Sequence, residues 1–222
     1  MTDWTTMIDA MGIYADNIPA VTGKVAGYVT GSNGILWNAS DWSRFPDAGK
    51  VRIDQAPGLP EYRAGRADVA DIESGAATVA EYAVAALERT ALKLTHHVYG
   101  SYSTLEAVAA AQAPVTDCWL ADPSLSQNEA IGLLGTRYRG LMIAAVQWAW
   151  PSTNPDSTCP GSVLPLSRLN VDLSVTLATW FPAPVEVPVE CVITWAGSDG
   201  LVARKTSVPR VMWDQLKFEQ AN

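Results

Sequence analysis

The sequence predicts an α/β fold, a short and irregular TIM-like (βα) barrel that lacks some of its helices. Short apolar segments alternate along the chain with segments that open on helix-capping sequences, as in parallel βα units. The apolar run LMIAAV (141–146) suits a strand that is buried on both faces. No GxGxxG follows the first expected βα strand and no P-loop occurs, so a closed barrel is favoured over a nucleotide-binding open sheet.

The individual elements follow from local patterns. Residues 3–16 place Trp4, Met7, Ile8 and Met11 at helical spacing, which predicts a leading helix. The expected strands are 24–31, 51–54, 66–73, 94–100, 118–121, 141–148 and 171–174. Capping sequences predict helices over 78–93, over 103–113 and after Ser126.

The barrel segment, residues 24–182, is shorter than the roughly 200 residues that an eight-unit barrel ordinarily needs. Several crossover helices are therefore expected to be missing, and the segment 151–169, rich in Pro, Ser and Thr, is expected to be a loop.

We expect two parts, a barrel with its leading helix over 1–182 and a linker with a small appendage over 183–222. The Pro-rich segment 182–188 indicates a stiff linker. Residues 189–196 and 201–208 alternate around a Gly-rich turn, which predicts a β-hairpin, and a short helix is expected from residue 209. This tail is too small to fold alone, so we expect it to pack on the barrel or on a partner.

Composition excludes several function classes. The 222 residues carry a formal net charge of −8 with scattered basic residues, so nucleic acid is not an expected partner. Cys118, Cys159 and Cys191 lie far apart without metal-ligand spacing, so we expect free thiols, no metal site and no cofactor. No apolar stretch approaches the roughly 18 residues that span a bilayer, and the N-terminus lacks the pattern of a secretory signal. Nine tryptophans are more than a core of this size needs and fit a carbohydrate-facing surface.

A set of short motifs occurs in an order that resembles the glycoside-hydrolase-like barrels of actinobacteria and their phages, which are similar to family 25 lysozymes. The resemblance covers roughly residues 16–182. The motifs are AGYVTG (26–31), W-x(4)-W-x-x-FP (37–46), VRID (51–54), ADVADIESGAAT (67–78), VYGSYSTL (98–105), WLAD (119–122), AVQW (145–148) and VDLS (171–174).

The resemblance implies a catalytic set of Asp71, Glu73 and Asp172. Strand alternation puts Asp71 and Glu73 on one face at the C-terminal end of a strand, where barrel enzymes place their chemistry. Glu73 matches the general acid of family 25 and Asp71 its partner, while Asp172 matches an aspartate near the family's last strand. We expect all three to share one cavity at the barrel mouth.

One position departs from the family pattern. Family 25 lysozymes begin with a strand that bears an aspartate close to the sugar, and Thr30 stands where that aspartate is expected. The resemblance therefore leaves the lysozyme mechanism short of one carboxylate, for which Asp54 is a candidate substitute. The candidate substrate-binding residues are Tyr28, Asp54, Tyr99, Gln147 and Trp148.

Three functions follow from these observations. The first is a phage virion or tail protein that binds cell-wall glycan, with residues 183–222 contacting other virion proteins. The second is an active peptidoglycan or polysaccharide hydrolase that uses Asp71 and Glu73. The third is a structural virion protein that recognises no glycan. The expected location is the virion, or the host cytoplasm before lysis.

Overall fold

The computed structural model describes residues 3–19, 23–31, 34–73 and 75–181, and the backbone of 189–197 and 200–208. The chain divides into two compact units, Met1–Ala183 and Pro184–Asn222. The expected linker over 182–188 and the expected helix from residue 209 lie outside the described residues.

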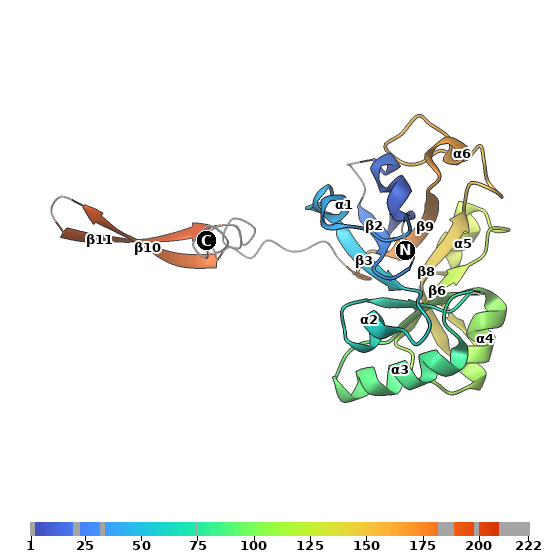
Figure 1. The fold of residues 1–222 in the computed structure, drawn as a ribbon. Coiled ribbons are helices and arrows are strands. Elements are labelled where there is room, and N and C mark those ends of the chain that lie inside the picture. The colour runs from blue at the N-terminus through green and yellow to red at the C-terminus, as the bar shows by residue number, and fades with distance from the viewer. Residues whose placement is uncertain are drawn as a thin grey trace. The chain divides into compact units, whose positions relative to one another are not determined.

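The first unit is a closed barrel of eight strands (Figure 1). The strand order is β1–β2–β3–β4–β5–β6–β8–β9, and β9 pairs with β1 to close the ring. Neighbouring strands are parallel except that β9 runs antiparallel to both β8 and β1. The predicted fold class is confirmed, with one antiparallel strand that the sequence pattern did not indicate. The strands are β1 (Trp4–Asp9), β2 (Lys24–Tyr28), β3 (Gly49–Asp54), β4 (Val69–Asp71), β5 (His97–Gly100), β6 (Asp117–Ala121), β8 (Leu141–Ala149) and β9 (Asp172–Leu177), with a short β7 (Arg137–Tyr138) beside β8.

The predicted leading helix over 3–16 is wrong. Trp4–Asp9 form strand β1, and only Gly12–Asn17 form one short 3₁₀ helix. Met7 packs inside the barrel and Ile8 packs outside it, so both faces of β1 are covered. A strand buried on both faces loses the apolar–polar alternation that distinguishes strands from helices, which explains the misassignment.

The barrel length predicted that several crossover helices are missing, but each connection between neighbouring barrel strands contains a helix. The barrel is short because several of these helices have only four or five residues, and the expected loop over 151–169 ends in one of them, α6. Among the described helices the longest is α3 (Val79–Ala91), which begins at a capping box between Thr78 and Glu81. A second capping box joins Ser126 to Glu129 at α5. At α4 the cap is Ser101, two residues before the expected Ser103. The other helices are α1 (Ala39–Ser43), α2 (Pro60–Arg63), α4 (Tyr102–Ala110), α5 (Gln127–Leu133) and α6 (Leu166–Leu169).

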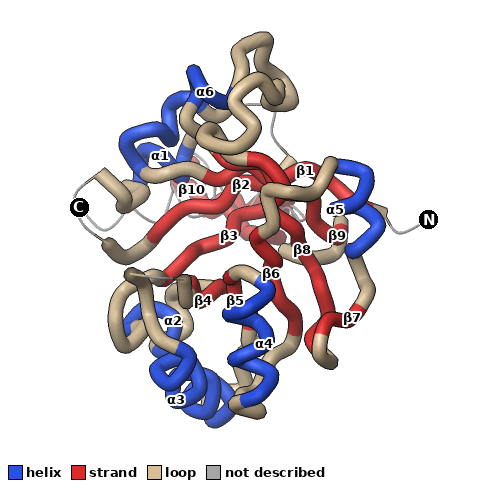
Figure 2. Tube along the Cα trace, turned by 90° about the vertical axis from the view of Figure 1, so that its right-hand side faces the viewer, coloured by secondary structure: helices blue, strands red, loops and turns tan. Residues whose placement is uncertain are grey.

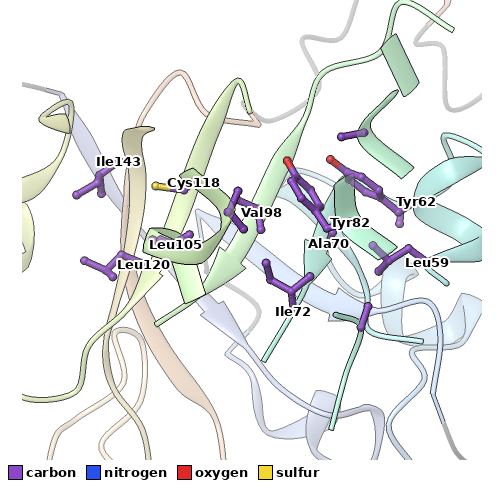
Figure 3. Packing of buried hydrophobic residues seen from close by; sticks show 14 of the residues in the cluster. Leu59, Tyr62, Ala70, Ile72, Tyr82, Val98, Leu105, Cys118, Leu120 and Ile143 are labelled. Atoms are coloured by element: carbon purple, nitrogen blue, oxygen red, sulfur yellow. The ribbon is translucent and has the colours of Figure 1, made fainter. Parts of the chain in front are cut away.

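Side chains alternate between the barrel interior and an outer layer under the helices. Helices α2, α3 and α4 lie together on one side of the barrel, whereas α1 and α6 lie on another (Figure 2). Under the first group, Val98, Leu105 and Leu120 belong to one buried cluster (Figure 3). Inside the barrel, Trp119 packs with small and branched side chains such as Ala145. The interior is therefore a filled core below the mouth.

Polar contacts close the base of the barrel. Lys24 on β2 donates from Nζ to the carbonyl oxygens of Leu177 at 2.6 Å and Ala178 at 3.1 Å. His97 Nδ1 lies 2.6 Å from Asp117 Oδ1, which also accepts a hydrogen bond from Trp180 Nε1 at 2.8 Å. His97 is the first residue of β5, so it lies at the end of the barrel where the parallel strands begin. The mouth formed by the carboxyl ends of these strands is at the opposite end.

The second unit contains a two-stranded antiparallel sheet, β10 (Val189–Gly197) and β11 (Gly200–Val208). This hairpin matches the one expected from the sequence. Within the described residues, no other strand pairs with it.

Cys118 and Cys159 are buried free thiols, while the side chain of Cys191 lies outside the described part of the chain. Among the described helices, none combines the length and the apolar character needed to cross a bilayer.

Candidate active site

The carboxyl ends of the parallel strands form one rim of the barrel, and the antiparallel β9 contributes its N-terminal end to the same rim. A cavity of about 480 Å³ opens there. Its lining residues include Asp9, Tyr28, Glu73, Tyr99, Gln147 and Asp172. These residues come from the ends of six different segments of the chain, as is usual for sites of parallel barrels.

Asp9 ends β1 and Asp172 begins β9, and the two residues are direct partners across the antiparallel pair. Asp9 is only 3% exposed. Burial, followed by the charges of Asp172 and Asp71, raises the pKa of Asp9 well above its usual range. Burial also raises the pKa of Asp172 to about 7, although a hydrogen bond from Gln147 Nε2 to its Oδ2 at 2.9 Å opposes that shift.

Asp71 ends β4, and Glu73 follows two residues later. Asp71 Oδ1 accepts a hydrogen bond from the backbone N–H of Glu73 at 3.0 Å, which fixes the turn between them. Burial raises the pKa of Asp71 to about 6. Burial and the charge of Asp71 raise the pKa of Glu73 to about 7. Near neutral pH, Asp71 is therefore mostly ionised while Glu73 keeps a large protonated fraction.

Aromatic side chains form much of the remaining wall. Tyr28 and Tyr99 stand at the ends of β2 and β5, Tyr14 lies in the 3₁₀ helix that follows β1, and Trp150 lies in the loop after β8. Burial and then the charge of a nearby acid, Asp71 for Tyr28 and Glu73 for Tyr99, raise the pKa of both phenols well above 10. Both hydroxyls therefore stay neutral and can donate hydrogen bonds.

Most of the predicted site residues meet at this mouth. Glu73, Asp172, Tyr28, Tyr99 and Gln147 line the cavity, and the charge of Asp71 acts on the acids in it.

Asp54 and Trp148 lie elsewhere. Asp54 is fully buried on the outer side of β3, where its Oδ2 accepts hydrogen bonds from the backbone N–H groups of Glu61 and Tyr62 at the start of α2. Trp148 follows the inward Gln147 by one residue, so it packs against the outer clusters and borders a different pocket. Asp54 is a structural group, and Trp150 occupies the cavity position expected for Trp148.

Sequence reasoning missed Asp9, Tyr14 and Trp150. Asp9 was hidden because residues 4–9 were assigned to a helix, so β2 was taken as the first strand and Thr30 as the place of the first aspartate. The first strand is β1, and it ends on Asp9 at the mouth. A carboxylate therefore ends the first strand, and the signal that could have found it is the pair of β-branched residues Thr5 and Thr6 before Met7.

The described residues contain no group of three or more His, Cys, Asp or Glu side chains arranged to hold a metal ion.

The four acids at the mouth are Asp9, Asp71, Glu73 and Asp172, and we call them the carboxyl quartet.

Among solved structures, a glycosyl hydrolase 25 of Streptococcus pneumoniae, described as a novel virulence factor participating in host cell invasion, is similar to this chain. The two chains share 12% sequence identity with a TM-score of 0.48, and the alignment covers 78% of this chain and 86% of that chain. No protein-family model and no curated protein matched the sequence.

Replacement of Thr30 by Asp is expected to destabilise the barrel. Thr30 Oγ1 donates to Asp54 Oδ1 at 2.5 Å and accepts from the backbone N–H of Gln55 at 3.0 Å. A second carboxylate beside the buried Asp54 would repel it, so we expect Thr30→Asp to lower the free energy of unfolding by about 2–4 kcal/mol. Thr30→Ser keeps the hydroxyl and is the control. Urea unfolding of the three proteins measures the difference, and equal midpoints would contradict this assignment.

The carboxyl quartet is expected to make the barrel less stable as the pH rises from about 5 to about 7. Each quartet acid has a raised pKa, so in this range the unfolded chain has already lost protons that the folded chain retains. Four surface acids with lowered pKa values act in the opposite direction, but only below their usual pKa near 4.5; they are Glu61, Glu81, Glu88 and Glu129.

Asp9→Asn removes one buried acid at nearly constant volume. We expect this variant to gain about 1–3 kcal/mol over the unaltered chain near pH 7, and the gain to shrink towards pH 4. Asp47→Asn, at an exposed position, is the matched control. Thermal unfolding at both pH values measures the gain, and a pH-independent difference for Asp9→Asn would show that Asp9 titrates normally.

Proposed function

We propose that the barrel is a glycoside hydrolase that cleaves a glycan of the bacterial cell wall. The observation that carries the proposal is the carboxyl quartet, four acids with raised pKa values gathered at one barrel mouth. Acids held at different pKa values in one cavity are what glycosidic cleavage requires, because one must give a proton while another stays ionised.

In this proposal Glu73 is the general acid. Its pKa of about 7 keeps a proton available near neutral pH for the leaving glycosidic oxygen. Asp71, with a pKa of about 6, is the anion that stabilises the cation-like transition state or positions the attacking group. The hydrogen bond from the Glu73 N–H to Asp71 favours this division, since it stabilises the ionised form of Asp71.

The cavity walls fit a sugar. Tyr14, Tyr28, Tyr99 and Trp150 offer flat apolar rings, and the phenol hydroxyls and the Gln147 amide offer hydrogen bonds. A volume of about 480 Å³ lies in the range of small-molecule sites. The choice of peptidoglycan as the glycan rests on the motif resemblance to family 25 lysozymes.

A barrel that binds glycan without cleaving it is the second candidate. One reason to favour it from the sequence was the missing first-strand aspartate, and Asp9 removes that reason. A structural role without glycan recognition accounts for neither the acids nor the aromatic walls.

We also propose that the chain belongs to a phage particle, to which residues 183–222 attach the barrel. The motif resemblance supports this setting, and so does the division of the chain into two units, because the described sheet of the second unit has only two strands. Mass spectrometry of purified particles is the test, and particles that lack the chain would refute it.

The proposed activity is tested by the release of reducing ends from purified peptidoglycan. We expect the full chain to release them, and Glu73→Gln to lower the rate by about 100-fold or more. The rate should fall as the pH rises above about 7, where Glu73 loses its proton, and also as it falls below about 6, where Asp71 gains one.

The matched control is Glu106→Gln on the exposed surface of α4, which should keep the full rate. If the unaltered chain binds peptidoglycan without releasing reducing ends, the barrel is a binding module. If Glu73→Gln and Glu106→Gln cleave equally fast, Glu73 is not the acid.

A further inference from the structure

Two acids of the quartet, Asp9 and Asp172, face each other across paired strands, and the mechanism proposed above assigns neither of them a role. Asp9 and Asp172 are direct partners in the β1–β9 register, so their Cα atoms lie about 4.5–5.5 Å apart and their side chains share one face. Both line the same cavity. Two carboxyl groups this close cannot both ionise without a large electrostatic cost.

Their hydrogen-bond partners differ. Asp172 Oδ2 accepts from Gln147 Nε2 at 2.9 Å, and Gln147 itself is only 3% exposed. Asp9 Oδ1 is buried and accepts no hydrogen bond. An ionised oxygen without a donor is costly to bury, whereas a protonated carboxyl group becomes a donor to a neighbouring acceptor.

Among the residues that the structure describes, no positively charged group acts on the pKa of Asp9, and the one influence that lowers this pKa is a backbone hydrogen bond at Asp9 itself. Asp172 faces it from β9, Asp71 and Glu73 face it from the end of β4, and the charge of Asp9 in turn acts on the phenols of Tyr28 and Tyr99. Every one of these groups is an acid. Burial together with three neighbouring carboxylates therefore favours the neutral form of Asp9.

We propose that Asp9 and Asp172 share one proton that resides mainly on Asp9, and that Gln147 is the positioning residue that keeps Asp172 the ionised member. When both acids are protonated, the pair holds two protons. As the pH rises, the pair releases one of them to solvent and retains the other. Asp9 then donates a hydrogen bond to Asp172, and Gln147 donates a second one to the same carboxylate.

This arrangement deepens the proposed hydrolase, because it lowers the negative charge of the quartet. With Asp9 neutral, the Asp172 carboxylate is held by two donors, and Glu73 faces one fewer anion. The protonation of the pair itself does not depend on hydrolase activity, so it can be tested separately.

The test is carboxyl ¹³C NMR of the full chain labelled at the aspartate side-chain carboxyl carbon and titrated with acid and base. Signals are assigned with Asp9→Asn and Asp172→Asn. We expect the Asp9 signal to have the shift of a neutral acid at neutral pH. Removing the donor with Gln147→Met should raise the Asp172 midpoint by about one pH unit. Gln127→Met, a Gln to Met exchange at the start of α5, is the matched control and should leave the midpoint unchanged.

Asp172→Asn offers a second readout if Gln147→Met does not fold. It removes the neighbouring charge and supplies an amide donor, so the Asp9 midpoint should fall. An ionised Asp9 at neutral pH overturns the proposal, as does an Asp9 midpoint that does not change in Asp172→Asn. An Asp172 midpoint that is the same in Gln147→Met and Gln127→Met overturns the role of Gln147. An NMR result as expected without release of reducing ends would refute the hydrolase and leave the proton-sharing pair intact.

Discussion

Strand β1 pairs with β2 in parallel and with β9 in antiparallel orientation, and these two pairings close the barrel. The same pairings decide where the acids lie. Because β9 runs against its neighbours, its first residue, Asp172, meets the last residue of β1, Asp9, at the rim where the parallel strands end. If β9 paired with β1 in a register shifted by one residue, Asp172 would point to the outer layer and Asp9 would lose its partner. The register of β1 against β9 is thus the constraint on which the carboxyl quartet depends.

The quartet opposes the stability of the fold that holds it. Burying acids costs free energy, so the mouth destabilises the folded state. Apolar packing around Trp119 and the hydrogen bonds of Lys24 stabilise the rest of the barrel. The polar groups of the base have partners of the opposite kind, as with His97 and Asp117. The four acids of the mouth face one another, and within the described residues they form no ion pair. This contrast between the two ends of one barrel is the physical basis for proposing the mouth as the site of the chemistry.

The sequence carried much of the fold because its signals are local. Capping boxes at Thr78 and Ser126 follow from neighbouring residues, as do the strands β2 to β6, β8 and β9. The acids of the Asp-x-Glu motif follow from alternation. Two parts required three-dimensional information. The apolar residues of β1 fit a helical spacing because both faces of that strand are buried. Trp150 lines the cavity in place of the predicted Trp148, and this depends on which side of β8 faces inward. The pairing of β8 has a register shift between Gln147 and Ala149, at that point of the strand.

In the proposed reaction, a glycan is cleaved between the acids that β1, β4 and β9 bring together. The position of a bound sugar tests this proposal most directly. A crystal structure of the full-length Glu73→Gln variant with a peptidoglycan fragment should show a glycosidic oxygen within hydrogen-bonding distance of residue 73. The sugar on one side of that bond should lie beside Asp9 and Asp172. A fragment bound only at the outer pocket beside Trp148, with the mouth empty at saturating concentration, would contradict the account.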